Sequence, residues 1–195
     1  MQPMDHQVVD RDVRAVVLVE GASDRQALLT LARRHGRDLA TDGIAVLAMG
    51  GASSIGHYLD RFGPHGADLR LAGLCDVGEE ADFRRGLERV GLGVDLERSD
   101  MERLGFHVCD LDLEDELIRS LGTAKVERLI AEQGELSSFH TFQAQPEWRG
   151  RPVADQLRRF LGTRSGRKVR YGRVLVEALD LAKVPHPLGA VLDHL

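Results

Sequence analysis

The 195-residue chain carries 26 basic and 31 acidic side chains, for a net charge of −5, and it is 43% hydrophobic but only 5% aromatic. This length and hydrophobic content suffice for one domain with an aliphatic core, with or without a small appended lobe. The acidic balance argues against a wholly basic nucleic-acid-binding coat, but it is compatible with a local basic face. With no run of 18 apolar residues and no apolar leader, the chain is expected to be a soluble cytoplasmic protein without membrane association.

The first predicted element is a buried strand at residues 14–19, followed at once by an acid and a glycine, Glu20 and Gly21. A helix is predicted to follow, with Ser23 as its N-cap, Asp24 in its first turn and Gly36 near its end. In open α/β sheets the carboxyl ends of the strands are where ligands bind. Glu20 is therefore expected at such a position, with Asp24 nearby.

Strands and helices alternate through the first two thirds of the chain. Further strands are predicted at 43–49, 69–76 and 105–110, helices at 55–62, 79–91 and 111–122, and an irregular segment with one helical turn at 91–104. This alternation favours crossover units and a parallel sheet. The two cysteines, Cys75 and Cys109, fall within predicted strands, and they are too few for a disulfide framework or a zinc site. We expect them to be buried, unreactive thiols.

From residue 123 onward the spacing is helical, with helices predicted at 126–134, 153–162 and 169–181 and a polar link at 135–152. We expect an α/β domain at 14–121 and a helical, arginine-rich C-terminal extension at 122–195 that packs on it. The segment 148–173 contains nine basic residues and a single acid, Asp155. A segregation of this kind suits a protein that binds a polyanion with one part of the chain.

Acidic residues follow three of the predicted strands. They are Glu20 and Asp24 after the first strand, Asp76, Glu79 and Glu80 after the third, and Asp110, Asp112 and Glu114 after the fourth. In a parallel sheet these side chains would meet at one edge, where their mutual repulsion raises their pKa values unless a cation is present. Mg²⁺ or Mn²⁺ prefers such oxygen ligands, and the chemistry it supports is phosphoryl transfer or phosphodiester hydrolysis. The alternative is structural, since acids in the first turn of a helix are favoured by the helix dipole.

The order of motifs along the chain resembles that of the topoisomerase-primase (TOPRIM) domain. The motifs are VLVEG-x-SDR, then a strand followed by GG, a strand ending in Asp and a strand followed by D-L-E. The nearest variety is that of the OLD-family nucleases, and the resemblance covers residues 14–121. It implies a four-stranded parallel sheet flanked by helices. It also implies one or two Mg²⁺ ions that serve nucleic-acid cleavage or nucleotidyl transfer.

By position, the resemblance gives Glu20 the role of metal ligand or general base and Asp24 that of the second acid of the OLD type. Asp76 matches the first aspartate of the family's D-x-D motif, and Asp112 and Glu114 match its later D-x-E pair. The chain departs from the family where the second aspartate of D-x-D is replaced by Gly78. Glu79 and Glu80 are the candidate substitutes for this missing ligand.

OLD-type domains also carry a functional lysine after the acidic motifs, and Lys168 is the candidate here, in a role that would stabilise charge on a phosphate. The same segment, 162–168, lacks the spacing of a P-loop, so ATP hydrolysis is not expected, and a separate ATPase is a possible partner. Residues proposed to bind nucleic acid are Arg149, Arg151, Arg164, Arg167 and Arg170. Trp148 next to them could stack on a base, but it is more typical of a packing anchor.

These features lead to the hypothesis of a Mg²⁺-dependent (or Mn²⁺-dependent) nucleic-acid endonuclease of the TOPRIM type, with DNA favoured over RNA. One alternative is a catalytically degenerate domain that binds nucleic acid or a partner ATPase. Another is a nucleotidyl transferase or phosphohydrolase that acts on free nucleotides. The sequence leaves the oligomeric state open.

Overall fold

The computed structural model describes residues 13–195, apart from the side chain of Ser165. Four parallel strands form one sheet in the order β2-β1-β3-β4: β1 (Ala15–Val19), β2 (Ile44–Ala48), β3 (Arg70–Asp76) and β4 (Phe106–Cys109). Each strand falls within the range predicted from its apolar run. The predicted fold class, a four-stranded parallel sheet flanked by helices, is confirmed.

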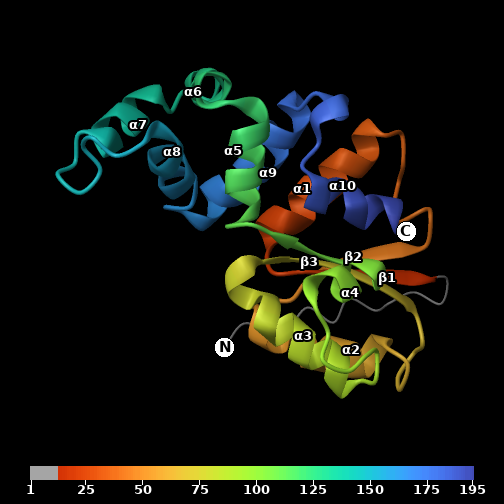
Figure 1. Cartoon of the computed structure of the whole chain (residues 1–195). Helices are drawn as coiled ribbons and strands as arrows, with labels where there is room; N and C mark the ends of the chain where they lie inside the picture. The colour runs from red at the N-terminus through yellow and green to blue at the C-terminus, as the bar shows by residue number, and fades with distance from the viewer. Residues whose placement is uncertain (1–12) are drawn as a thin grey trace.

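Helices cover both faces of this sheet (Figure 1). One face carries α1 (Ala22–Arg34), α5 (Leu113–Leu121), α9 (Ser165–Ala178) and α10 (His186–Asp193), and the other carries α2 (Ile55–Phe62), α3 (Glu80–Arg89) and α4 (Arg98–Arg103). Three further helices, α6 (Thr123–Glu132), α7 (Leu136–Gln143) and α8 (Val153–Leu161), lie to one side of the sheet in Figure 1. Short 3₁₀ turns, η1 (Ala52–Ser54), η2 (Val77–Glu79) and η3 (Leu181–Lys183), complete the described elements.

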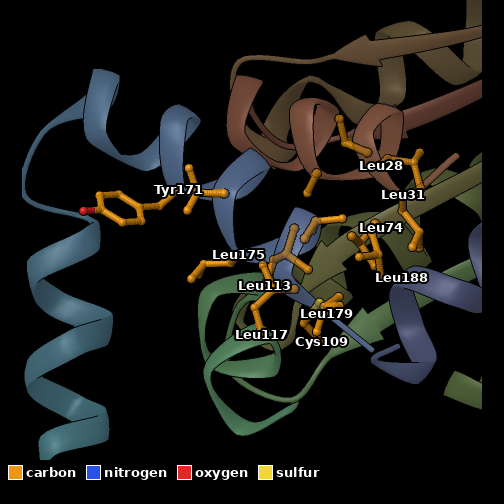
Figure 2. Packing of buried hydrophobic residues seen from close by; sticks show 14 of the residues in the cluster. Leu28, Leu31, Leu74, Cys109, Leu113, Leu117, Tyr171, Leu175, Leu179 and Leu188 are labelled. Carbon is orange, nitrogen blue, oxygen red and sulfur yellow. The ribbon is translucent and has the colours of Figure 1, made fainter. Parts of the chain in front are cut away.

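The central strand β1 explains this layering. All five of its residues are buried: Ala15, Val17 and Val19 belong to the core under α1, and Val16 and Leu18 belong to the core under α2 and α3. Successive side chains of a strand point to opposite faces, so a continuous apolar run requires a helical layer on each side. Figure 2 shows part of the first core, with Leu28 and Leu31 of α1 beside Leu74 of β3.

The prediction of a polar link without a helix at 135–152 is wrong, because this segment contains α7. Its two buried aromatic residues, Phe139 and Phe142, pack on Phe160 of α8 with ring centroids 5.1 and 5.7 Å apart. Trp148 stacks on Phe142 at 5.1 Å, which gives this tryptophan a packing role. The serine and threonine content of the segment hides a helix that forms because its aromatic residues are buried by tertiary contacts.

The core of the α1 face runs without a break from the strands into α6, α8, α9 and α10. The division of the chain at residue 121 therefore stays a prediction. Cys75 and Cys109 are both buried free thiols. Burial raises the pKa of each thiol far above its usual value, which makes both poor nucleophiles. None of the helices described in residues 13–195 is long and apolar enough to span a membrane.

Candidate functional site

The sheet topology brings the ends of β1, β3 and β4 together. The register pairs Val19 with Leu74 and Asp76 with Cys109, so the residues that follow these strands emerge at the same edge. The connection from β1 to β2 runs through α1 on one face, and the connection from β2 to β3 runs through α2 on the other. The point between β1 and β3 where the connections diverge is the usual ligand crevice of a doubly wound sheet.

The Gly-Gly turn after β2 holds the backbone of Glu20. The N–H groups of Gly50 and Gly51 both donate to the Glu20 carbonyl oxygen, at 3.0 and 3.3 Å. Their φ angles of +75° and +128° lie in the region that favours glycine. These N–H groups are used inside the protein, which favours the role of a tight turn over that of a phosphate cradle.

Six carboxyl groups at this edge influence one another and form the carboxylate cluster: Glu20, Asp24, Asp76, Glu79, Asp112 and Glu114. Asp76 is one of the strongly affected groups. Burial raises its pKa to about 8, with further contributions from the negative charges of Asp24, Asp112 and Glu20. The crowding predicted from the three strand ends is therefore present in the fold.

Glu79 and Glu80 are adjacent in sequence but lie in different surroundings. Burial, followed by the charge of Glu20, raises the pKa of Glu79 to about 7, and its Oε2 atom is buried without a hydrogen-bond partner among the described residues. Glu80 instead accepts hydrogen bonds from Arg98 (2.6 Å) and Arg84 (2.7 Å), which lower its pKa. The 3₁₀ turn η2 returns Glu79 to the cluster, so of the two candidate substitutes only Glu79 joins it.

Asp24 and Asp112 have structural tasks as well. Asp24 accepts the N–H of Gly21 at 2.9 Å and Asp112 accepts that of Asp115 at 2.9 Å, each at the start of a helix. The second oxygen of Asp112 accepts a 2.6 Å hydrogen bond from Arg158 of α8. The helix-start explanation thus holds for both residues, and it does not remove either from the cluster. Burial raises the pKa of Asp24, partly offset by Lys168.

Lys168 of α9 reaches the cluster, with its Nζ atom 3.3 Å from Oε2 of Glu114. Burial lowers the pKa of Lys168, but the carboxylates of Glu114 and Asp24 outweigh this and raise it well above the usual value. Burial has the opposite effect on Glu114: it raises the pKa of this carboxyl group to about 7, although the positive charge of Lys168 lowers it. A close helix contact makes this possible: a Cβ on Gly172, one turn after Lys168, would lie 2.8 Å from the Ser23 carbonyl oxygen.

The arginines predicted to bind nucleic acid divide into two groups. Arg149, Arg151 and Arg164 are exposed. Arg167 is buried, salt-bridged to Glu135 at 2.9 Å and stacked on Phe160 at 4.0 Å, so it serves the packing of α9 instead of a surface. Arg170 also pairs with Glu135 and is half-buried.

Arg158 is a site residue that sequence reasoning missed. In the sequence it is one of nine basic residues between 148 and 173, and no pattern distinguishes it from the others. The packing of α8 against α5 brings it to Asp112. No helical periodicity carries that information.

The carboxylate cluster offers a set of oxygen donors for a divalent cation. The chemistry fits, because the donor atoms are all oxygens, the pKa values of Asp76 and Glu79 are raised, and the buried Glu79 Oε2 lacks a hydrogen-bond partner among the described residues. Within residues 13–195, Glu20, Asp76 and Glu79 take part in no salt bridge, whereas Asp112 and Glu114 are each paired with a basic residue. In the arrangement described, no group of three such side chains is positioned to hold a metal ion.

The comparisons with known proteins agree with this architecture. Residues 13–76 match the family model described as "Overcoming lysogenization defect protein-like, TOPRIM domain". The C-terminal region of the Xanthomonas campestris pv. campestris OLD protein superposes with a TM-score of 0.70 at 22% identity, over 93% of this chain and 94% of that one. The C-terminal region of the Burkholderia pseudomallei OLD protein gives 0.69 at 19% identity, over 93% and 96%. Comparison with curated proteins found no match.

The family match ends at Asp76, so it includes the first three strands and the Glu20 to Asp24 turn. The structural likeness extends over the helices that follow β4. Residues 13–76 are therefore similar to an OLD-like TOPRIM domain, and the chain has the fold of the C-terminal regions of OLD proteins.

Proposed function

We propose that this chain is a metal-dependent nucleic-acid phosphodiesterase of the OLD-like TOPRIM type, with Mg²⁺ or Mn²⁺ as its cofactor. The observation that carries the proposal is a set of three carboxylates, Glu20, Asp76 and Glu79, without basic partners among the described residues, beside Lys168 and Arg158. A protein has little reason to gather unpaired carboxylates at a strand edge unless a cation joins them.

Glu20, Asp76 and Glu79 would hold the ion once their side chains turn toward a common point, and Asp24, Asp112 and Glu114 would surround it. A bound divalent ion supplies a water of lowered pKa and neutralises charge on the phosphate. Glu20 would also accept the proton of an attacking water; its place directly after the central strand and the fixing of its backbone by the Gly-Gly turn support this role. Because the pKa of Asp76 is raised to about 8 and that of Glu79 to about 7, both groups are only partly ionised near pH 7, and a bound cation would favour their charged forms.

Lys168 and Arg158 provide positive charge at the same edge. Each is held by a carboxylate of the cluster, so each has a fixed position beside the reacting phosphate. Arg149, Arg151 and Arg164 are exposed and available to the substrate backbone. We propose nucleic acid as the substrate, with DNA tested before RNA, and an ATPase on the same or a separate chain as the partner.

The test is a cleavage assay with labelled DNA and RNA oligonucleotides and, in parallel, nucleoside triphosphates, each with Mg²⁺, with Mn²⁺ and with chelator. We expect divalent-ion-dependent cleavage of oligonucleotide that Glu20→Gln reduces by at least about a hundredfold, a size typical of loss of a catalytic base. The matched control is Glu80→Gln, which removes a carboxylate outside the cluster. Turnover of free nucleotides alone would favour a phosphohydrolase, and binding without cleavage under every ion would favour a degenerate domain.

A further inference from the structure

A groove between α1 and α9 stands apart from the carboxylate cluster. Its cavity has a volume of about 670 Å³ and is lined by residues of both helices. Four of the lining residues are arginines, Arg33 and Arg34 of α1 and Arg170 and Arg173 of α9, and Glu177 is the one carboxylate among them. Its lining is therefore strongly positive in a chain whose net charge is −5.

Most of this positive charge is not neutralised inside the protein. Among residues 13–195, Arg33 and Arg34 form no salt bridge; Arg33 donates to Thr30 Oγ1 at 3.2 Å and Arg34 to the Val176 carbonyl at 2.9 Å. Arg173 is exposed and has only a long contact of 3.9 Å with Glu177. Guanidinium groups that present free N–H donors in a concave surface are suited to phosphate oxygens.

The groove lies on the same two helices that bring Asp24 and Lys168 to the carboxylate cluster. Gln26, at one end of it, is two residues after Asp24, and Gly166 is two residues before Lys168. From Gln26 to Arg34 the helix rises about 12 Å, and successive phosphates of one DNA strand advance by ~3.4 Å along the axis. The arginines can therefore follow a strand over roughly three nucleotides.

We propose that the α1–α9 groove binds the phosphate backbone of the nucleic-acid strand that leads to the carboxylate cluster. This inference rests on the proposed function and adds the path of the substrate, which passes over α1 as well as over the arginine-rich C-terminal helices. An acidic peptide would be the alternative occupant, and the test below separates the two.

The test is fluorescence anisotropy with a labelled 20-nucleotide single strand and its duplex, in chelator so that nothing is cleaved, at several salt concentrations. The groove variant is Arg33→Gln/Arg173→Gln, which takes one exposed arginine from each helix. The control is Arg85→Gln/Arg103→Gln, which removes the same charge from exposed arginines of α3 and α4 on the opposite face of the sheet. Thermal denaturation checks that both variants fold.

We expect the groove variant to bind about tenfold more weakly, with a slope of log affinity against log salt reduced by about 1.5, and the control to stay within about twofold of the parent. Equal affinities for the two variants, or no oligonucleotide binding by the parent, would overturn the inference. Displacement of the oligonucleotide from the parent by a poly-glutamate peptide, at concentrations that leave the groove variant's binding unchanged, would favour the acidic peptide as the occupant and overturn the inference. If the parent cleaves the oligonucleotide and the groove variant binds like the parent, the proposed function stands and only the groove inference is overturned. If the groove variant binds more weakly but the parent shows no metal-dependent cleavage, the groove binds nucleic acid and the proposed function is overturned.

Discussion

Lys168 is the residue on which the charge balance of the carboxylate cluster depends. Its positive charge lowers the pKa of Asp24, Asp76 and Glu114, all of which burial raises. It is also the group through which α9, distant in sequence, reaches the edge of the sheet. Its candidacy could be stated from the sequence because the resemblance named a lysine after the acids, but its partner Glu114 could not.

Lys168→Met is expected to destabilise the protein by about 1–3 kcal/mol at pH 8, because it leaves the buried Glu114 carboxylate unpaired. The loss should shrink at pH 5.5, since the pKa of Glu114 is about 7 and its neutral form needs no partner. Urea denaturation at the two pH values measures this. The double variant with Glu114→Gln should recover much of the stability, and a loss that does not change with pH would contradict the pairing.

The raised pKa values also predict how stability depends on pH. A carboxyl group whose pKa is higher in the folded state favours folding below its unfolded value, near 4, and loses that contribution as pH rises to the folded value. For Asp76 the folded value is about 8 and for Glu79 about 7. The free energy of unfolding in chelator should therefore fall from pH 5.5 to pH 8.

Asp76→Asn should flatten this fall and stabilise the metal-free protein at pH 8 by about 1 kcal/mol or more, since it removes a group that resists ionisation there. Chemical denaturation from pH 5.5 to 8.5 tests the prediction. If Asp76→Asn is less stable than the parent at pH 8 in chelator, the carboxylate is held by contacts that the structure does not contain.

At the scale of elements, the contact between α1 and α9 positions the site. Gly172 lies against the Ser23 carbonyl, so the two helix backbones approach closely and Lys168 comes to lie near Asp24. The sequence shows Gly172 only as a glycine within a predicted helix, and it does not indicate that another helix packs closely against it. The strands and α1 were predictable because apolar runs and helical spacing are local signals, although the N-cap of α1 is Gly21 and not the predicted Ser23. By contrast, α7 and the Arg158–Asp112 pair arise from tertiary contacts between distant segments.

Gly172→Ala is expected to destabilise the protein by about 1–3 kcal/mol, because its Cβ would lie 2.8 Å from a backbone oxygen and α9 would have to shift. Gly166→Ala in the same helix is the matched control. A Cβ there meets nothing within 4 Å, so it should be neutral or slightly stabilising through helix propensity. Thermal denaturation of the two variants gives the comparison, and similar melting temperatures would show that the close approach is not required.

The whole molecule combines a parallel sheet, which collects carboxylates at one edge, with C-terminal helices that bring basic residues to the same edge. The sequence predicted the first half of this arrangement, since the acids follow the strands directly. It predicted the second half only as an excess of charge, because the faces of α8 and α9 that carry Arg158 and Lys168 are fixed by how these helices pack on α1 and α5. Arg167 shows why the excess of charge was not enough: it belongs to the same basic segment as the exposed arginines, but its side chain is buried.

The central claim is that Glu79, and not its neighbour Glu80, completes a cation site with Glu20 and Asp76. Calorimetric titration of Mn²⁺ into the parent, Glu79→Gln and Glu80→Gln at pH 8 tests it most directly. We expect the parent and Glu80→Gln to bind the ion with affinities within about twofold of each other, and Glu79→Gln to bind at least about tenfold more weakly. No binding by the parent, or equal affinities for the two glutamine variants, would contradict it.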